Sequence, residues 1–264
     1  MPRVSGAAMK LTLENTDKLV TLVVDGHDIR ARIWQGATES GIPVHLSRFQ
    51  DAEIYAAITG IGTRSVESEL RDLFRKTADV CIATGLAGSL RKPYSAGSVL
   101  VAKTIKAAGN EREMKSDDFL VAAAEGCGAV KVDCFFTSNT VVNSPVEKSR
   151  LGQIADAVEM ESFHVVSLAN EYGIPAVPVR AISDDAETNV PIDLNRVIDG
   201  RGQIRWVPAL REIAKTPRRA PQLIRFGLDS SRAVRHLASF LDRYARFLIA
   251  RRTVQFSVVH SETK

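Results

Sequence analysis

Residues 158–185, VEMESFHVVSLANEYGIPAVPVRAISDD, constrain the fold of this chain more than any other stretch. Apolar residues recur along one side of a helix from Phe163 to Tyr172, and Gly173 stands where glycine commonly ends a helix. Residues 174–182 are almost continuously apolar, which indicates a strand covered on both faces. A helix followed at once by a doubly covered strand predicts an α/β protein.

Acidic residues stand at both ends of this pattern. Glu159 and Glu161 are expected to open the helix, where the positive end of the helix dipole favours negative charge. Ser183 and Asp184 end the strand, and open α/β sheets bind their ligands at the carboxyl ends of strands. The acidic residues can therefore converge on one small molecule.

The motifs V-E-M-E at 158–161 and R-A-I-S-D at 180–184 resemble those of the purine nucleoside/uridine phosphorylase family, which includes the methylthioadenosine/S-adenosylhomocysteine nucleosidases. The resemblance extends over residues 19–190. It implies a three-layer α/β/α domain around a central mixed sheet. It also implies cleavage of the N-glycosidic bond of a purine, adenine-type nucleoside, by phosphorolysis or hydrolysis, with no cofactor apart from phosphate as a co-substrate.

The resemblance assigns roles to the residues of both motifs. Glu161 binds the ribose hydroxyls, Met160 packs on the sugar face, and Glu159 is a weaker candidate for sugar binding. Asp184, preceded by Ser183, donates a proton to the imidazole part of the purine so that the base leaves neutral. An aspartate can do this near neutral pH only where burial or a nearby carboxylate stabilises its protonated form.

Two further segments are similar to the family's base-binding loops. Thr84 and Gly85 begin a segment like the family's T-G-x-A-G, whose backbone borders the base. Val141 stands where the nucleosidases carry an aromatic residue that stacks on the base, and Val142 follows it. These four residues are predicted to line the substrate pocket.

The nucleophile is open between phosphate and water. The G-x-x-x-R-A spacing at 26–31 is that of the family's phosphate loop, and the T-G-x-G turn at 59–62 lines its ribose or phosphate pocket. The phosphate ligands predicted in this way are Gly26, Arg30, Gly60 and Gly62. Against phosphate, Ala83 stands where phosphorylases usually have an arginine, and Leu86 where many members have a serine or threonine.

Charge divides the chain unevenly. Residues 200–264 contain 14 Lys and Arg against 4 Asp and Glu, whereas the remainder contains 21 against 27. We expect a loosely ordered N-terminus (residues 1–17), a phosphorylase-like domain (18–199) and a basic helical extension (200–264). Within the domain, the polar residues 106–120 are expected to form a loop or lid.

The extension contains an amphipathic helix over residues 229–250, capped by Asp229 or Ser230, with arginines beside an apolar stripe. This helix can pack on its own domain, form a subunit interface or lie on an anionic bilayer. The segment P-I-D-L…V-I-D-G-R-G before it resembles the hopanoid-associated phosphorylases, which act on an adenosyl-bearing lipid. That resemblance favours membrane contact.

Nothing in the cysteine or histidine pattern suggests a metal. Cys81, Cys127 and Cys134 lack CxxC spacing, and the one E-x-x-H, at Glu161 and His164, has no second copy. No apolar run reaches the roughly 18 residues of a membrane span, and no secretory pattern opens the chain. We therefore expect a cytoplasmic homo-oligomer, free or peripheral to the inner face of the membrane, that binds a small nucleoside and no nucleic acid. The alternatives are a nucleoside-binding relative without catalysis, and a nucleosidase that uses water on a lipid-linked adenosine.

The spacing of Gly26 and Arg30 leads to a first prediction, that phosphate is the nucleophile. In phosphate buffer, a purine nucleoside should yield ribose 1-phosphate together with the free base. Chromatography of the products measures this directly, with a phosphate-free buffer as the control. Free ribose as the sugar product in both buffers would reverse the prediction.

Overall fold

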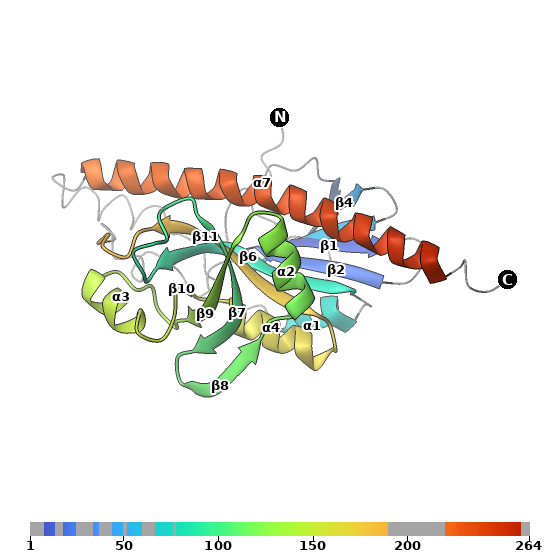
Figure 1. The fold of residues 1–264 in the computed structure, drawn as a ribbon, viewed down its shortest axis with the longest axis horizontal. Helices are drawn as coiled ribbons and strands as arrows, with labels where there is room; N and C mark the ends of the chain where they lie inside the picture. Colours follow the sequence, from blue (N-terminus) through green and yellow to red (C-terminus); the bar gives the residue numbers. More distant parts are fainter. Residues whose placement is uncertain are drawn as a thin grey trace.

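The computed structural model describes residues 8–13, 18–24, 34–36, 44–49, 52–59, 67–75, 78–189 and 220–259. These residues form one mixed sheet between two layers of helices (Figure 1). The strands in chain order are β1 (Ala8–Leu13), β2 (Lys18–Val24), β3 (Trp34–Gly36), β4 (Val44–Phe49), β5 (Ala52–Ile58), β6 (Val80–Ser89), β7 (Val99–Ala107), β8 (Asn110–Lys115), β9 (Val130–Thr137), β10 (Ala157–Glu159) and β11 (Ala176–Asp184). The predicted fold class, α/β with a central mixed sheet and a C-terminal helix, is confirmed.

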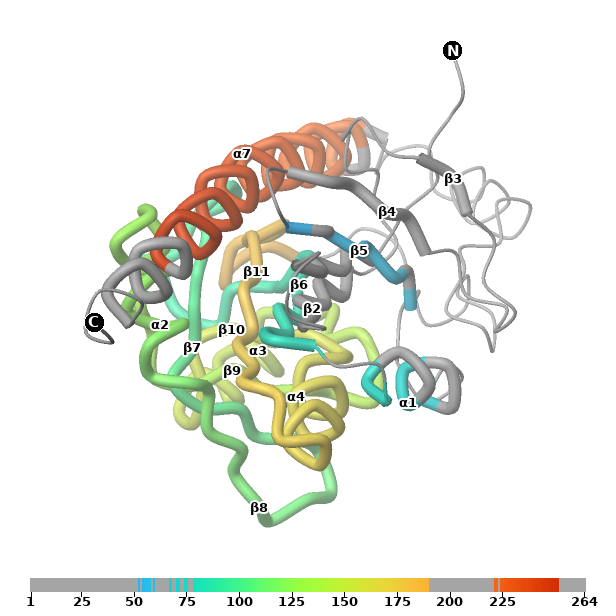
Figure 2. The backbone as a smooth tube through the Cα atoms, turned by 90° about the vertical axis from the view of Figure 1, so that its right-hand side faces the viewer, coloured from blue at the N-terminus to red at the C-terminus, as the bar shows by residue number. Residues whose placement is uncertain are grey.

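Helices of the described residues cover both faces of the sheet (Figure 2). Helices α1 (Glu67–Arg75) and α4 (Ser162–Glu171) pack on one face. Helices α2 (Asp118–Gly126) and α7 (Ala220–Val259) pack on the other. The short helix α3 (Pro145–Leu151) follows β9 and lies at the end of the sheet where β11 finishes. Each face has its own apolar cluster, so the sheet is buried on both sides.

Strand β11 lies at the centre, and all nine of its residues are buried. It pairs with β6 in parallel and with β7 in antiparallel orientation. Pairing with β7 begins at Val179, directly after Pro178, which has no N–H to donate. Side chains of β11 alternate between the two faces: Val179 and Ala181 join the α7 face, whereas Ile182 joins the α4 face.

The short strand β10 brings the V-E-M-E motif onto the central strands. It pairs with β9 in parallel and also with the end of β6, where Val158 lies opposite Gly88. The register between β11 and β6 shifts between Ile182 and Asp184, so Asp184 also lies opposite Gly88. The two motifs identified in the sequence therefore meet at one glycine.

Several boundaries differ from those expected from the sequence. Helix α4 begins at Ser162, so Glu159 ends a strand and does not open the helix. Residues 106–120, expected to be a loop or lid, contain β8 and the start of α2, which Asp117 caps by accepting the N–H of Leu120 at 2.9 Å. Strand β1 lies within residues 1–17, where the sequence shows no periodicity.

Helix α7 is longer than predicted and packs on its own domain. It begins at Ala220, so Asp229 and Ser230 lie inside it and are not its N-cap. Leu237, Leu241 and Tyr244 are buried against the sheet, and the Tyr244 hydroxyl donates to the Leu120 carbonyl at 2.7 Å. Of the three roles open to the apolar stripe, the structure shows packing on its own domain. None of the helices described here is both long and apolar enough to cross a membrane.

The burial of α7 predicts a large difference between two leucines of the same helix. Leu237 is 3% exposed and Leu228 is 65% exposed. Leu237→Ala should lower the free energy of unfolding by about 2–5 kcal/mol, because it leaves a cavity against the sheet. Leu228→Ala should change it by no more than about 0.5 kcal/mol. Urea unfolding of both variants tests this, and equal losses would contradict the packing of α7.

Candidate active site

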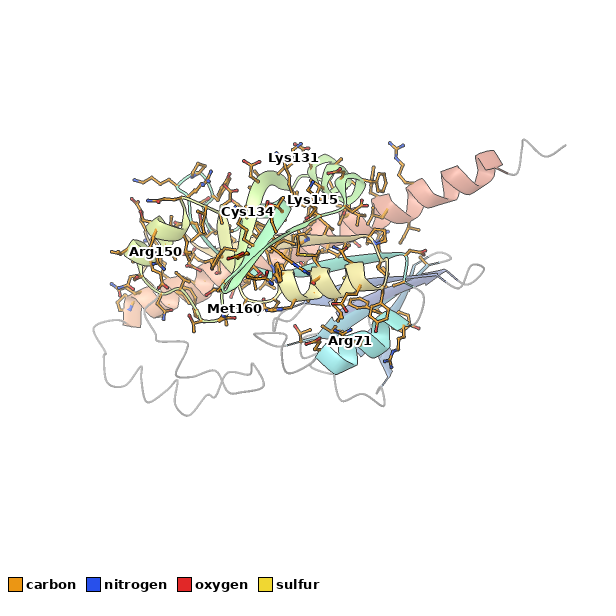
Figure 3. All side chains as sticks on the ribbon, turned by 90° about the horizontal axis from the view of Figure 1, so that it is seen from below. Arg71, Lys115, Lys131, Cys134, Arg150 and Met160 are labelled. Carbon is orange, nitrogen blue, oxygen red and sulfur yellow. The ribbon has the colours of Figure 1, made fainter. Side chains whose placement is uncertain are left out.

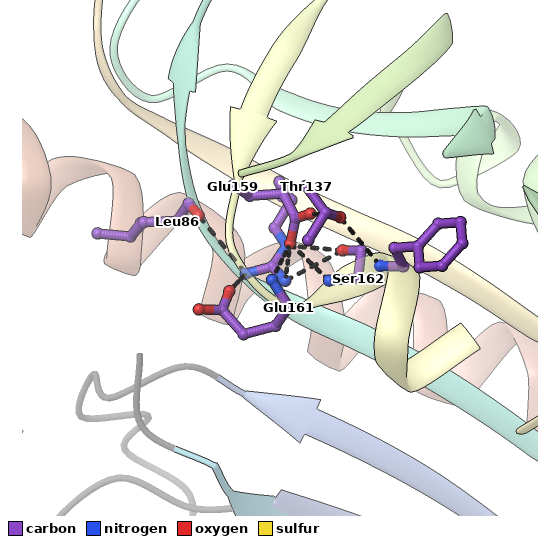
Figure 4. Close-up of polar contacts among 7 residues, drawn as sticks. Leu86, Thr137, Glu159, Glu161 and Ser162 are labelled. Atoms are coloured by element: carbon purple, nitrogen blue, oxygen red, sulfur yellow. Dashed lines mark hydrogen bonds and ion pairs between the residues drawn. The ribbon is translucent and has the colours of Figure 1, made fainter. Parts of the chain in front are cut away.

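A buried arginine lies at the centre of the candidate site. Arg180, on β11, is 1% exposed and contacts both glutamates of the V-E-M-E motif (Figure 4). Its Nη2 lies 2.5 Å from Glu159 Oε2, and its Nη1 lies 3.2 Å from Glu161 Oε2. Nε and Nη2 also donate to Ser162 Oγ, at 3.2 and 3.0 Å. One guanidinium thus fixes three consecutive features of the chain: the end of β10, the turn and the start of α4.

Glu159 holds the first turn of α4. Its Oε2 accepts the backbone N–H groups of Glu161 and Ser162 at 2.9 and 2.7 Å, in addition to Arg180. Its Oε1 accepts the hydroxyl of Thr137, whose oxygen in turn accepts the N–H of Phe163 at 3.0 Å. These contacts satisfy both carboxylate oxygens and give Glu159 a structural role that the sequence analysis did not predict.

Arg180 is a further residue of this site whose role was not predicted from the sequence. A signal was present, because an arginine inside a strand that is otherwise apolar and doubly covered has to be paired with carboxylates. The two glutamates of V-E-M-E supply that pair. Glu161 is 3% exposed, so its carboxylate is held by Arg180 in a site largely closed to water.

The second acidic position, Asp184, is 8% exposed at the end of β11. The Ser183 hydroxyl donates to its Oδ1 at 2.6 Å. Its Oδ2 forms an ion pair with Nζ of Lys148, a fully buried residue of α3. The sequence analysis expected burial or a neighbouring carboxylate around Asp184. Burial is confirmed, but the neighbour is a cation, and nothing in the sequence analysis singled out Lys148.

Gly88 is the point at which the two motifs converge. A Cβ atom on this residue would lie 3.2 Å from Asp184 Oδ2 and 3.4 Å from Val158 Cγ1. Glycine therefore leaves the space in which the Asp184 carboxylate packs beside the V-E-M-E segment. The ribose-binding and base-protonating residues inferred from the sequence are brought to one end of the sheet.

The remaining predicted pocket residues fall into two groups. Met160 and Val141 are half-buried, Val142 is buried beside Val158, and Met160 lies near the start of α4 (Figure 3). Thr84 and Gly85 pair with Val179 and Arg180 on β11. Because Val179 faces α7, Thr84 also points to that face, away from Arg180, and can offer only its backbone to the site.

Some predictions cannot be placed. Gly26, Arg30, Gly60 and Gly62, the phosphate ligands predicted from the sequence, lie outside the described residues. Within the described residues, no three His, Cys, Asp or Glu side chains gather in a way that could hold a metal ion.

The chain is similar to known proteins in sequence and in fold. A family model described as the phosphorylase superfamily matches residues 27–201. The 5′-methylthioadenosine/S-adenosylhomocysteine nucleosidase of Helicobacter pylori is similar in structure, with a TM-score of 0.64 and 17% identity, covering 86% of this chain and 97% of that one. The corresponding enzyme of Neisseria meningitidis has a TM-score of 0.63 and 18% identity, covering 86% of this chain and 97% of that one. A futalosine hydrolase mutant of Helicobacter pylori has a TM-score of 0.62 and 15% identity, covering 86% of this chain and 98% of that one.

The family match and the fold indicate an enzyme of the nucleoside phosphorylase or nucleosidase class. The chain belongs to the phosphorylase superfamily.

The arrangement around Arg180 predicts a strong effect on stability. Arg180→Ala would leave two buried carboxylates without their cation, so the free energy of unfolding should fall by about 3–5 kcal/mol. Arg71 is a matched control, because it also bridges two glutamates, Glu67 and Glu171, each at 2.8 Å, but at the surface (Figure 3). Arg71→Ala should cost far less in the same urea titration. Similar losses for both variants would argue against a buried network.

Proposed function

We propose that this protein cleaves the N-glycosidic bond of a purine nucleoside, with Glu161 on the ribose and Asp184 on the base. The observation that carries the proposal is the convergence at Gly88, which pairs both with Asp184 and with Val158, three residues before Glu161. Cleavage of such a bond passes through an oxocarbenium-like transition state, with positive charge on the sugar. Negative charge develops on the departing base. The sugar therefore needs a negatively charged neighbour, whereas the base needs a proton donor.

On the sugar side, Glu161 would accept hydrogen bonds from ribose hydroxyls. These bonds strengthen as positive charge grows on the ring, so a carboxylate already fixed in place stabilises the transition state more than the ground state. Arg180 supports this role because it holds Glu161 without any rearrangement. Met160, half-buried beside Glu161, would cover the sugar face.

On the base side, Asp184 would pass a proton to the purine imidazole nitrogen. Asn143 is a second candidate for base recognition, since its Oδ1 is buried and has no hydrogen-bond partner in the structure. Buried carbonyl oxygens of this kind are rarely left unsatisfied. An exocyclic amine on the purine base could donate to it.

Either water or phosphate can act as the nucleophile in this reaction. The relatives named above are nucleosidases and a hydrolase, which favours water for this chain. The spacing of Gly26 and Arg30 favours phosphate. The product analysis described above separates the two.

If Asp184 transfers a proton to the base, Asp184→Asn should lower kcat for a purine nucleoside by about 10²–10⁴-fold. The amide oxygen can still accept from Lys148, so the fold should persist, which circular dichroism can check. Release of the free base, followed by chromatography, measures the turnover. A variant that kept more than about a tenth of the wild-type kcat would rule out the proton-transfer role, since that loss is below the usual range.

If Glu161 contacts the ribose hydroxyls, its effect should depend on the 2′-hydroxyl. Glu161→Gln should reduce kcat/KM for a ribonucleoside much more than for the 2′-deoxy analogue, because the analogue has already lost one partner. The measurement is the ratio of kcat/KM between the two substrates, in wild type and variant. An equal fall in kcat/KM for both substrates would mean that Glu161 does not contact the 2′-hydroxyl.

A further inference from the structure

Lys148 is a fully buried cation whose role the family motifs do not explain. It projects from α3, and its Nζ contacts Asp184 Oδ2, the Asp185 carbonyl oxygen at 2.7 Å and the Thr188 carbonyl oxygen at 3.2 Å. A protonated amine has three N–H donors, and these three acceptors use all of them. A buried ammonium with a single carboxylate partner is costly to maintain, which suggests that the pair is kept for a function.

The same three contacts also suit the neutral form of the pair. If the proton moves from Lys148 to Asp184, the amine keeps two N–H groups for the carbonyls of Asp185 and Thr188. Its lone pair then accepts the hydrogen of the carboxylic acid. No buried donor or acceptor of the pair is left unsatisfied in either form, so the proton can reside on either residue without any rearrangement of the chain.

We propose that Lys148 supplies, through Asp184, the proton that the departing base takes up. This inference rests on the proposed function. As the C1′–N9 bond breaks, its electron pair passes to the base. The one proton that the pair shares moves from Lys148 to Asp184 and from Asp184 to the base, which leaves a carboxylate beside a neutral amine. The water that attacks C1′ releases a proton that restores the ammonium, and in phosphorolysis solvent supplies it.

This relay explains how Asp184 can act as an acid beside a buried cation. An isolated ion pair holds an aspartate in its ionised form, which cannot donate. A pair that shares one proton between two satisfied states can donate while remaining buried. Lys148 does not contact the substrate in this scheme, so it is a positioning and proton-supplying residue that acts only through Asp184.

A double-mutant cycle tests the proposal with a purine nucleoside as the substrate. Lys148→Met should lower kcat about 10²-fold or more, with little change in KM, because the variant binds the nucleoside but has lost its proton. The same change made in an Asp184→Asn background should cost less than about threefold, since the relay is already broken. Arg150→Gln, at an exposed position of the same helix, is the control and should retain wild-type kcat (Figure 3).

A second substrate separates proton supply from structure. A 4-nitrophenyl riboside releases a phenolate that needs no proton, so Lys148→Met should largely spare its turnover. If Lys148→Met does not fold, Lys148→Gln takes its place in both assays. The glutamine amide keeps two N–H donors for the carbonyls of Asp185 and Thr188. Equal losses on the two substrates, or equal losses in the two backgrounds, would overturn the relay and leave Lys148 a structural residue. A wild-type protein that cleaved no nucleoside would instead overturn the proposed function itself.

Discussion

The ion pairs of one buried arginine hold the functional end of this molecule together. Arg180 belongs to the central strand, and its partners belong to β10, the following turn and α4. A buried guanidinium without partners is costly, so these elements can pack on β11 only with both glutamates in place. The same guanidinium also fixes Glu161, the residue proposed to bind the ribose. Stability and preorganisation therefore depend on one group.

Much of this arrangement could be predicted from the sequence, because the patterns that matter are local. The apolar run before Ser183 indicates a doubly covered strand, and the motifs at 158–161 and 180–184 flag the residues that converge. Contacts between residues that are far apart in the sequence could not be predicted in this way. Lys148 lies 36 residues from Asp184, in a short helix with no unusual pattern, and only the packing of α3 against the end of β11 makes it a neighbour. Glu159 is likewise only a weaker candidate for sugar binding in the motif, and its structural role becomes visible only in its hydrogen bonds.

The amphipathic helix could be predicted from the sequence, but the surface on which it packs could not. Its periodicity was clear, but the same stripe suits a domain, a partner or a bilayer, and periodicity cannot distinguish among them. The structure resolves this, because Leu237, Phe240 and Tyr244 complete the apolar cluster on one face of the sheet. The arginines that suggested a membrane instead occupy the outer side of the helix, where Arg232, Arg235 and Arg246 are exposed.

The place of α7 in the core has a consequence for how the protein forms in the cell. One face of the sheet is covered largely by residues 233–249, which are synthesised after every strand. Until those residues leave the ribosome, the apolar side chains of β6 and β11 that α7 covers stay exposed, and α2 shields only part of that face. A growing chain in this state is prone to aggregation. The nascent protein should therefore be a client of chaperones that bind exposed strands, and it should be released from them only when α7 docks.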